Sequence, residues 1–263
     1  MSIGRTAPRL LNIVPIGPAH PTAYHCGCHA CERPATKLPR LLLHNAVSLD
    51  GRIDWITPDI GRFYELAGRW DEDASLVGAD TLLAPEPGLD DPAPPPEPEA
   101  VAPPPAPPDP TKPRLVVIDS RGRIRNWPEL LNGAYWSRGV ALCSERTPAE
   151  YFDYLDSVGV ERIVAGGNRV DLHAALAKLA AKYGIDRVRV DSGGRLNGAL
   201  LRAGLIDEVS LLVHPYLVGG ESGQTFFRAP DLTSAGRVIN LRLIAAEILE
   251  DDLFWLRYEL IRG

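Results

Sequence analysis

Short apolar segments alternate with amphipathic segments over most of the chain, and this alternation is the strongest constraint on its fold. Strands are predicted at 41–47, 74–77, 115–118, 139–143, 162–165, 187–190 and 209–213, and helices at 59–70, 148–157, 171–182 and 194–203. Two longer apolar segments, 237–249 and 253–261, close the chain. The pattern predicts a mixed α/β fold, with a mostly parallel central sheet flanked by helices and an antiparallel C-terminal hairpin.

A proline tract interrupts this pattern. Fourteen of the 25 prolines lie between Pro85 and Pro113. Repeated proline removes backbone donors and favours polyproline II, so the tract is neither a helix nor a central strand. The sequence predicts an extension over residues 1–39, then a domain over 40–263 that an exposed loop at 85–113 interrupts. A ligand for a proline-recognition domain is the alternative to a stiff surface insertion.

The distribution of charge argues against a nucleic-acid-binding protein. Residues 1–40 carry five basic and one acidic side chain, a net charge of +4, whereas the remaining 223 carry 23 basic and 33 acidic ones, a net charge of −10. An acidic main body lacks the basic surface that nucleic acids need. No apolar run approaches the ~20 residues of a membrane span, and no signal peptide is evident. We therefore expect a soluble, cytoplasmic protein.

Three turns follow predicted strands, which is where sheets of this kind bind ligands. The paired glycines of Asp191-Ser192-Gly193-Gly194 would let a phosphate approach the amides of the following helix. Gly78-Ala79-Asp80-Thr81 offers amides and a hydroxyl. Asp119-Ser120-Arg121-Gly122-Arg123 offers a serine and two arginines, which suit a phosphate monoester such as the 2′-phosphate of NADP.

Each turn also has a purely structural interpretation. The glycines of 191–194 fit a tight turn, Asp80 or Thr81 could cap a helix, and 119–123 could be a solvated basic loop. A fourth turn, Ala165-Gly166-Gly167-Asn168, is interpreted as structural alone. The sequence contains neither a P-loop nor a nucleophile elbow.

The order of these segments resembles the reductase domain of the riboflavin-biosynthesis deaminase–reductase family, the RibD C-terminal-domain type. The resemblance runs from about residue 39 to the end and is carried by four segments, 47–53, 75–81, 114–119 and 188–220. It implies a dihydrofolate-reductase-like fold and a homodimer. It also implies hydride transfer from NADPH to a C=N or C=O carbon of a small substrate, in this family a phosphoribosyl-aminopyrimidine.

The resemblance assigns cofactor contacts. Those implied for the pyrophosphate are Gly78, Ala79, Thr81, Ser192, Gly193 and Gly194. Ser120 and Arg121 are implied for the adenosine 2′-phosphate, and Thr57 matches a threonine that follows the first loop.

Two side chains are nominated as proton donors for the reduction. Asp50 lies in the loop that borders the nicotinamide in the family, and His44 lies on the preceding strand. The alternatives are a carboxylate that caps its own turn and a half-buried strand histidine.

Departures from the family fall on the substrate side. Relatives usually carry an acidic residue immediately before the glycine pair, where this chain has Ser192, and an Ala-Asp-x-Pro run where it has Ala84-Pro85-Glu86-Pro87. His44 replaces a common lysine, and an arginine that follows the Asp-x-Pro run is lost in the proline tract. The departures predict a reductase whose substrate is altered or unknown. The alternatives are a dihydrofolate-like or other heterocycle reductase, and a non-catalytic NADPH- or metal-binding protein.

A cysteine and histidine cluster stands apart from this resemblance. Cys26, Cys28, Cys31 and His29 offer thiolate and imidazole ligands for zinc within a few residues. Most structural zinc sites use two separated ligand pairs, so a reactive tail is the alternative. Cys143 ends an apolar strand and is expected in the core.

Overall fold

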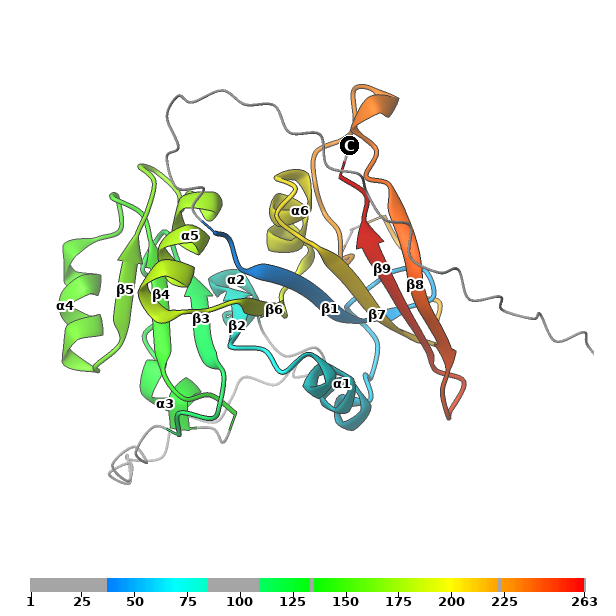
Figure 1. Ribbon diagram of the computed structural model, residues 1–263, viewed down its shortest axis with the longest axis horizontal. Coiled ribbons are helices and arrows are strands. Elements are labelled where there is room, and N and C mark those ends of the chain that lie inside the picture. The colour runs from blue at the N-terminus through cyan, green and yellow to red at the C-terminus, as the bar shows by residue number, and fades with distance from the viewer. Residues whose placement is uncertain (1–36, 85–108, 133–134, 222–223, 263) are drawn as a thin grey trace, which may run out of the picture. The chain divides into compact units, whose positions relative to one another are not determined.

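The structure, a computed structural model, describes residues 37–84, 109–132, 135–221 and 224–262. The chain divides into two units, Met1–Ala35 and Thr36–Gly263, and every described residue belongs to the second. Within the described ranges, nine strands form one sheet in the order β5-β4-β3-β2-β6-β1-β7-β9-β8 (Figure 1). Their bounds are β1 Arg40–Ser48, β2 Ala74–Gly78, β3 Arg114–Ile118, β4 Gly139–Cys143, β5 Glu161–Val164, β6 Arg187–Val190, β7 Glu208–His214, β8 Leu241–Ile248 and β9 Phe254–Leu260.

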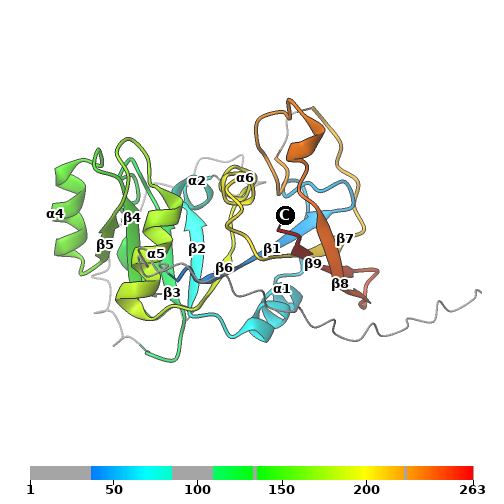
Figure 2. The same cartoon turned by 45° about the horizontal axis from the view of Figure 1, so that its top comes forward.

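The pairing of the strands confirms the predicted fold class. All neighbours from β5 through β7 pair in parallel, whereas β7 with β9 and β9 with β8 pair antiparallel. The C-terminal hairpin stands at the opposite end of the sheet from β5 (Figures 1 and 2). Its outer strand, β8, is exposed along almost its whole length.

Helices cover both faces of the parallel part. The helices are α1 Ile60–Ala67, α2 Ala79–Leu82, α3 Trp127–Asn132, α4 Ala149–Ser157, α5 Leu172–Tyr183 and α6 Gly194–Arg202, with short 3₁₀ segments at Gly68–Trp70 and Ala235–Arg237. Leu41 and Leu43 of β1 pack in one cluster with α5 and α6, and Leu42 packs in another with α1. Because successive residues of a strand point to opposite faces, β1 is buried on both, as is typical of parallel strands.

Two elements differ from the sequence prediction. Helix α3 was not expected, and Pro128 occupies its first turn, where proline is tolerated. The last hairpin is shorter than predicted, because β8 starts at Leu241, after a 3₁₀ segment at Ala235–Arg237 and three residues that are in neither a helix nor a strand. In the described ranges, no helix is long and apolar enough to cross a membrane.

Candidate functional site

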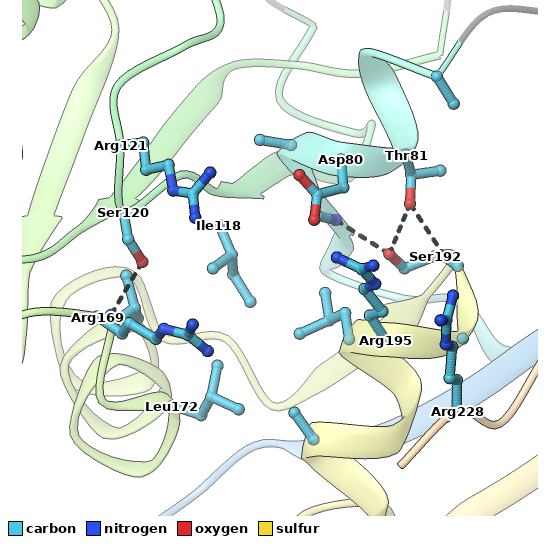
Figure 3. Close-up of a pocket in the computed structure, with 18 of the residues that line it drawn as sticks. Asp80, Thr81, Ile118, Ser120, Arg121, Arg169, Leu172, Ser192, Arg195 and Arg228 are labelled. Carbon is cyan, nitrogen blue, oxygen red and sulfur yellow. Dashed lines mark hydrogen bonds between the residues drawn. The ribbon is translucent and has the colours of Figure 1, made fainter. Parts of the chain in front are cut away.

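A cavity of about 990 Å³ opens at the carboxyl edge of the parallel strands (Figure 3). It is lined by the loops that follow β1, β2, β3, β5 and β6, by the first turns of α6, and by part of the segment 224–228. The three predicted ligand turns therefore meet in one place. Eight of the nine predicted cofactor residues line the cavity: Gly78, Ala79, Thr81, Ser120, Arg121, Ser192, Gly193 and Gly194. Thr57 is exposed and does not line it.

Direct hydrogen bonds join the glycine-pair turn to the turn after β2. Ser192 Oγ accepts from the Gly78 amide at 3.1 Å, and Thr81 Oγ1 accepts from the Gly193 amide at 3.0 Å. The two hydroxyl oxygens are 3.0 Å apart. Because that bond uses one of the two hydroxyl hydrogens, the other is left for a ligand. Both residues line the cavity, but Ser192 is buried and Thr81 is exposed, so the Thr81 hydroxyl is the more accessible of the two.

The start of α6 is open to the cavity. Its N-cap is Gly193, and no side chain caps its amides, whereas the Asp171 side chain caps α5 by accepting from the Ala174 amide. The expected cap of α2 by Asp80 or Thr81 is also absent, since Gly78 is the N-cap and has no side chain to accept from the helix amides. Uncapped amides at the positive end of a helix dipole suit an anion.

Arginine dominates the charge of the cavity. Five arginines and two aspartates line it: Arg121, Arg123, Arg169, Arg195, Arg228, Asp54 and Asp80. Asp80 pairs with Arg123 at 2.6 Å. Asp54 pairs at 2.7 Å with Arg52, which does not line the cavity. Among the described residues, no carboxylate lies within ion-pair distance of the other four lining arginines. The cavity therefore suits a ligand with several negative charges.

Asp119 shapes the arginine loop after β3. Its buried carboxylate accepts from the amides of Arg123 and Ile124 at 2.5 and 2.9 Å, and more weakly from that of Arg121 at 3.3 Å. This arrangement folds the loop back on the strand end, with Gly122 at φ +64°. The side chains of Ser120 and Arg121 consequently line the cavity.

The structure does not bring His44 to the cavity. Its ring is fully buried, with Nδ1 2.9 Å from Ser210 Oγ and Nε2 3.1 Å from the Phe63 carbonyl. The carbonyl can only accept, so Nε2 carries the hydrogen, and the Ser210 hydroxyl donates to Nδ1 while accepting from the Trp255 indole. Burial lowers the pKa of His44 to about 3. The placement agrees with the structural alternative, a histidine inside the core.

Asp50 also lies outside the cavity lining. Its carboxylate accepts from Ser48 Oγ at 2.5 Å and from the amides of Val218 and Gly219 at 3.2 and 2.7 Å. Two hydrogen bonds lower the pKa of Asp50 to about 2, and the one from Ser48 contributes more than the one from Gly219. Asp50 therefore ties the loop after β1 to the loop after β7 and is ionised at neutral pH.

An acidic residue remains at the end of β6 despite the serine before the glycine pair. Asp191 pairs with Arg189 at 3.0 Å, and the same buried guanidinium donates to Glu72 at 2.7 Å and Ser75 at 2.9 Å. Burial raises the pKa of Asp191, although Arg189 opposes the shift. Asp191 does not line the cavity, and Ser192 puts a neutral hydroxyl beside Gly78.

The predicted zinc ligands Cys26, Cys28, Cys31 and His29 lie outside the described residues. Within the described part of the chain, no group of three or more histidine, cysteine, aspartate or glutamate side chains could hold a metal ion. Cys143 is a free thiol buried in the core, as expected, and burial raises its pKa to about 12.

Three lining arginines were missed from the sequence. Arg195 occupies the first turn of α6, where the helix dipole disfavours a cation. Of the three, it is the one whose position in the sequence could have indicated an anion nearby. Arg169 follows the turn that was interpreted as structural, and Arg228 comes from a loop with no motif.

Comparison with known proteins gives a consistent family. The RibD C-terminal domain family matches residues 39–254. The 2,5-diamino-6-ribosylamino-4(3H)-pyrimidinone 5′-phosphate reductase of Methanothermobacter thermautotrophicus is 32% identical over 227 residues, which cover 82% of this chain and 95% of that protein. The riboflavin biosynthesis protein RibD of Actinobacillus pleuropneumoniae is 27% identical over 227 residues, which cover 83% of this chain and 56% of that protein.

Solved structures share the fold. Acinetobacter baumannii RibD, form 1, superposes with a TM-score of 0.61 at 24% identity, over 86% of this chain and 59% of that chain. A riboflavin biosynthesis reductase of Saccharomyces superposes with a TM-score of 0.58 at 18% identity, over 88% of this chain and 93% of that chain. The chain thus spans 56% and 59% of these two RibD proteins, and 95% and 93% of these two separate reductases.

Proposed function

The chain belongs to the RibD C-terminal domain family, and on that premise we propose that it is an NADPH-dependent reductase of a ribosylaminopyrimidine 5′-phosphate. The observation that carries the proposal is the arginine-lined cavity at the carboxyl edge of the sheet, in which the paired glycines, the Thr81 hydroxyl and four arginines without a described acidic partner meet. The family match also runs across the proline tract, which supports a single reductase domain from residue 40 onward.

The cavity residues fit NADPH by their chemistry. The open amides of α6 and the Thr81 hydroxyl would hold the pyrophosphate, and Arg195 and Arg228 would neutralise it. Ser120 and Arg121 would hold the adenosine 2′-phosphate. Bound NADPH supplies the hydride, which goes to a C=N or C=O carbon of the substrate.

The proton that completes the reduction has no obvious donor among the nominated residues. His44 is neutral inside the core, and Asp50 is ionised outside the cavity lining. The lining carboxylates, Asp54 and Asp80, are both paired with arginine. This favours solvent water as the proton source.

The test is direct. Binding is measured by titrating NADPH into the purified full chain. Turnover is measured as the loss of NADPH absorbance with 2,5-diamino-6-ribosylamino-4(3H)-pyrimidinone 5′-phosphate as substrate. Thr81→Val, which keeps the shape and removes the hydroxyl, should weaken NADPH binding by about 0.5–1.5 kcal/mol. Absence of binding at millimolar NADPH would refute a reductase. Binding with turnover of dihydrofolate or another heterocycle alone would point to the alternative enzyme, and binding with no turnover to a non-catalytic protein.

The homodimer is part of the proposal. In β8, Leu243, Ile244 and Ile248 are 52%, 42% and 82% exposed, and β8 is the last strand of the sheet, with no partner among the described strands on its outer side. A long apolar edge strand is a template for pairing with another chain, and a second copy of β8 would cover it symmetrically. Light scattering should give twice the mass of one chain, and Ile244→Lys should give a monomer. Leu217→Lys, on an exposed loop after β7, is the control. A monomeric wild type would count against the dimer.

Two further expectations belong here. We expect the protein in the cytoplasm, which cell fractionation tests. The metal proposal for residues 26–31 predicts about one equivalent of zinc in the purified protein and its loss when Cys26, Cys28 and Cys31 are changed to serine. Less than a tenth of an equivalent in the wild type would remove it.

A further inference from the structure

We propose that Arg169 and Arg121 together form a two-arginine site for the cofactor's 2′-phosphate, and that Arg169 makes this chain select NADPH over NADH. The inference rests on the proposed function and extends it to a residue that no motif in the sequence marked. It is argued from the loop that carries Arg169, from its link to the loop of Arg121, and from the charges at that end of the cavity.

The loop between β5 and α5 is built to hold Arg169 in place. Gly166 has φ +84°, and a Cβ there would collide with the Arg169 carbonyl, so only glycine fits. The Asp171 amide closes the loop on the Ala165 carbonyl at 3.0 Å. The carbonyls of Gly166 and Gly167 accept from the amides of residues 145 and 146 at 2.9 and 3.2 Å. The turn that was interpreted as structural therefore positions an arginine at the cavity.

Ser120 joins this loop to the loop of Arg121. Its Oγ accepts from the Val170 amide at 3.0 Å, and its carbonyl accepts from the Thr147 hydroxyl at 3.0 Å. The two arginine loops are thus fixed to each other at residues adjacent to both arginines. Figure 3 shows Arg121 and Arg169 on either side of Ser120, both reaching toward the same end of the cavity. The Ser120 hydroxyl hydrogen is not used in the Val170 bond and stays available to a phosphate oxygen.

The charges at this end call for a dianion. Arg121 and Arg169 are exposed, and within the described ranges neither has a carboxylate in ion-pair distance, whereas Arg123 is engaged by Asp80 at 2.6 Å. Two guanidinium groups that reach toward one end of a cavity repel each other, and an anion bound between them removes that repulsion. A phosphate monoester accepts hydrogen bonds from two arginines and a serine, which is the donor set present. NADH has a hydroxyl in place of that phosphate and cannot use the site in this way.

The apolar side chains beside the arginines fit the same ligand. Ile118 and Leu172 line the cavity between this end and the glycine pair (Figure 3). An adenine ring could lie against them, with the ribose 2′ position toward the arginines. The 2′-phosphate is the chemical difference that the site would recognise.

The experiment measures binding, independent of turnover. Calorimetry compares 2′,5′-ADP with 5′-AMP, and NADPH with NADH, on the full chain and on Arg169→Gln, Arg121→Gln and the double variant. Arg169→Gln should weaken 2′,5′-ADP and NADPH by about tenfold or more, the usual effect of losing one charge-assisted hydrogen bond, and leave 5′-AMP and NADH within about twofold. Arg146→Gln is the matched control, because Arg146 is exposed, adjoins the same loop and does not line the cavity. Thermal unfolding of each variant reports whether the fold is intact.

The outcomes separate this inference from the proposed function. Equal weakening of NADPH and NADH by Arg169→Gln, or no weakening of either, would overturn the role of Arg169 while leaving the reductase in place. Selective loss of 2′,5′-ADP in a protein that turns over no pyrimidine would support the site and refute the reductase. A wild type that binds neither 2′,5′-ADP nor NADPH would overturn both.

Discussion

The two glycines of the pair should respond differently to alanine, because the structure uses them for different purposes. A Cβ on Gly194 would overlap the carbonyl oxygen of Thr225, a backbone atom that cannot rotate away. A Cβ on Gly193 would meet Thr81 Oγ1 at 3.4 Å and Ile53 Cδ1 at 4.0 Å, both ordinary contacts with side chains. Gly193 has φ −73° and ψ 164°, which alanine adopts readily. Gly194→Ala should therefore damage the fold, and Gly193→Ala should damage the ligand site.

The size of the effect follows from the contacts. Relieving the overlap moves the segment 225–228 away from α6, at an overpacking cost of about 1–3 kcal/mol. The movement also stretches the 2.9 Å hydrogen bond from the Arg228 amide to the Gly194 carbonyl, worth about 1 kcal/mol. Alanine offsets up to about 1 kcal/mol through its higher helix propensity. The expected loss for Gly194→Ala is thus about 1–3 kcal/mol in the free energy of unfolding. Gly193→Ala should change it by less than about 0.5 kcal/mol.

Urea unfolding and NADPH titration measure both quantities on the same samples. Gly193→Ala should unfold like the wild type and bind NADPH at least about tenfold more weakly, since its methyl group enters the cavity where the pyrophosphate is proposed to lie. Gly194→Ala should unfold at lower urea. Equal stability of Gly194→Ala and wild type, or a larger loss in Gly193→Ala than in Gly194→Ala, would refute the steric argument.

Three further predictions concern titrating groups. The pKa of His44 is about 3 in the folded protein and near 6.5 in the unfolded chain, so the unfolded chain takes up this proton first as the pH falls. Between pH 6.5 and about 3 the free energy of unfolding should fall by about 1.4 kcal/mol for each pH unit, and His44→Gln should remove that part of the slope in pH-dependent urea unfolding. Asp50→Asn should leave the apparent pKa values of turnover between pH 5 and 9 unchanged, because Asp50 is already ionised; a shifted profile would restore it as a proton donor. With the three N-terminal cysteines changed to serine, Cys143 should react with a thiol reagent only as the protein unfolds, and rapid reaction in native buffer would contradict its burial.

The sequence predicted the fold class and most of the cavity wall for one physical reason. Parallel strands bring their carboxyl ends to one edge, so turns that follow separate strands are expected to meet there. Gly78, Ser120 and Gly193 came from such turns and do line one cavity. The two long apolar segments at the end of the chain predicted the antiparallel hairpin, and the order of the segments added the family.

The missed residues depend on contacts that no local pattern contains. Arg228 reaches the cavity because the segment before it bonds to the loop after β1, through the bridge of Thr225 with Arg52. Arg169 belongs to the loop after β5, which Ser120 joins to the loop after β3. His44 was nominated from its strand, and the structure places it in the core and not in the cavity lining. On a strand buried on both faces, periodicity cannot distinguish a side chain in the core from one beside a ligand.

The position of β1 in the sheet has a consequence for how this chain folds as it is made. Both neighbours of β1 come from distant parts of the chain, Arg187–Val190 and Glu208–His214, although β1 itself spans Arg40–Ser48. At about 5–20 residues per second, the ribosome needs roughly 10–30 s after β1 to complete both partners. During that interval an apolar strand has no place to pair, and closing its loops is slow because its contacts are far apart in sequence. Productive folding should therefore depend on keeping β1 unpaired until β6 and β7 emerge. Slower synthesis or a higher concentration of nascent chains should increase aggregation through this strand before it affects any other.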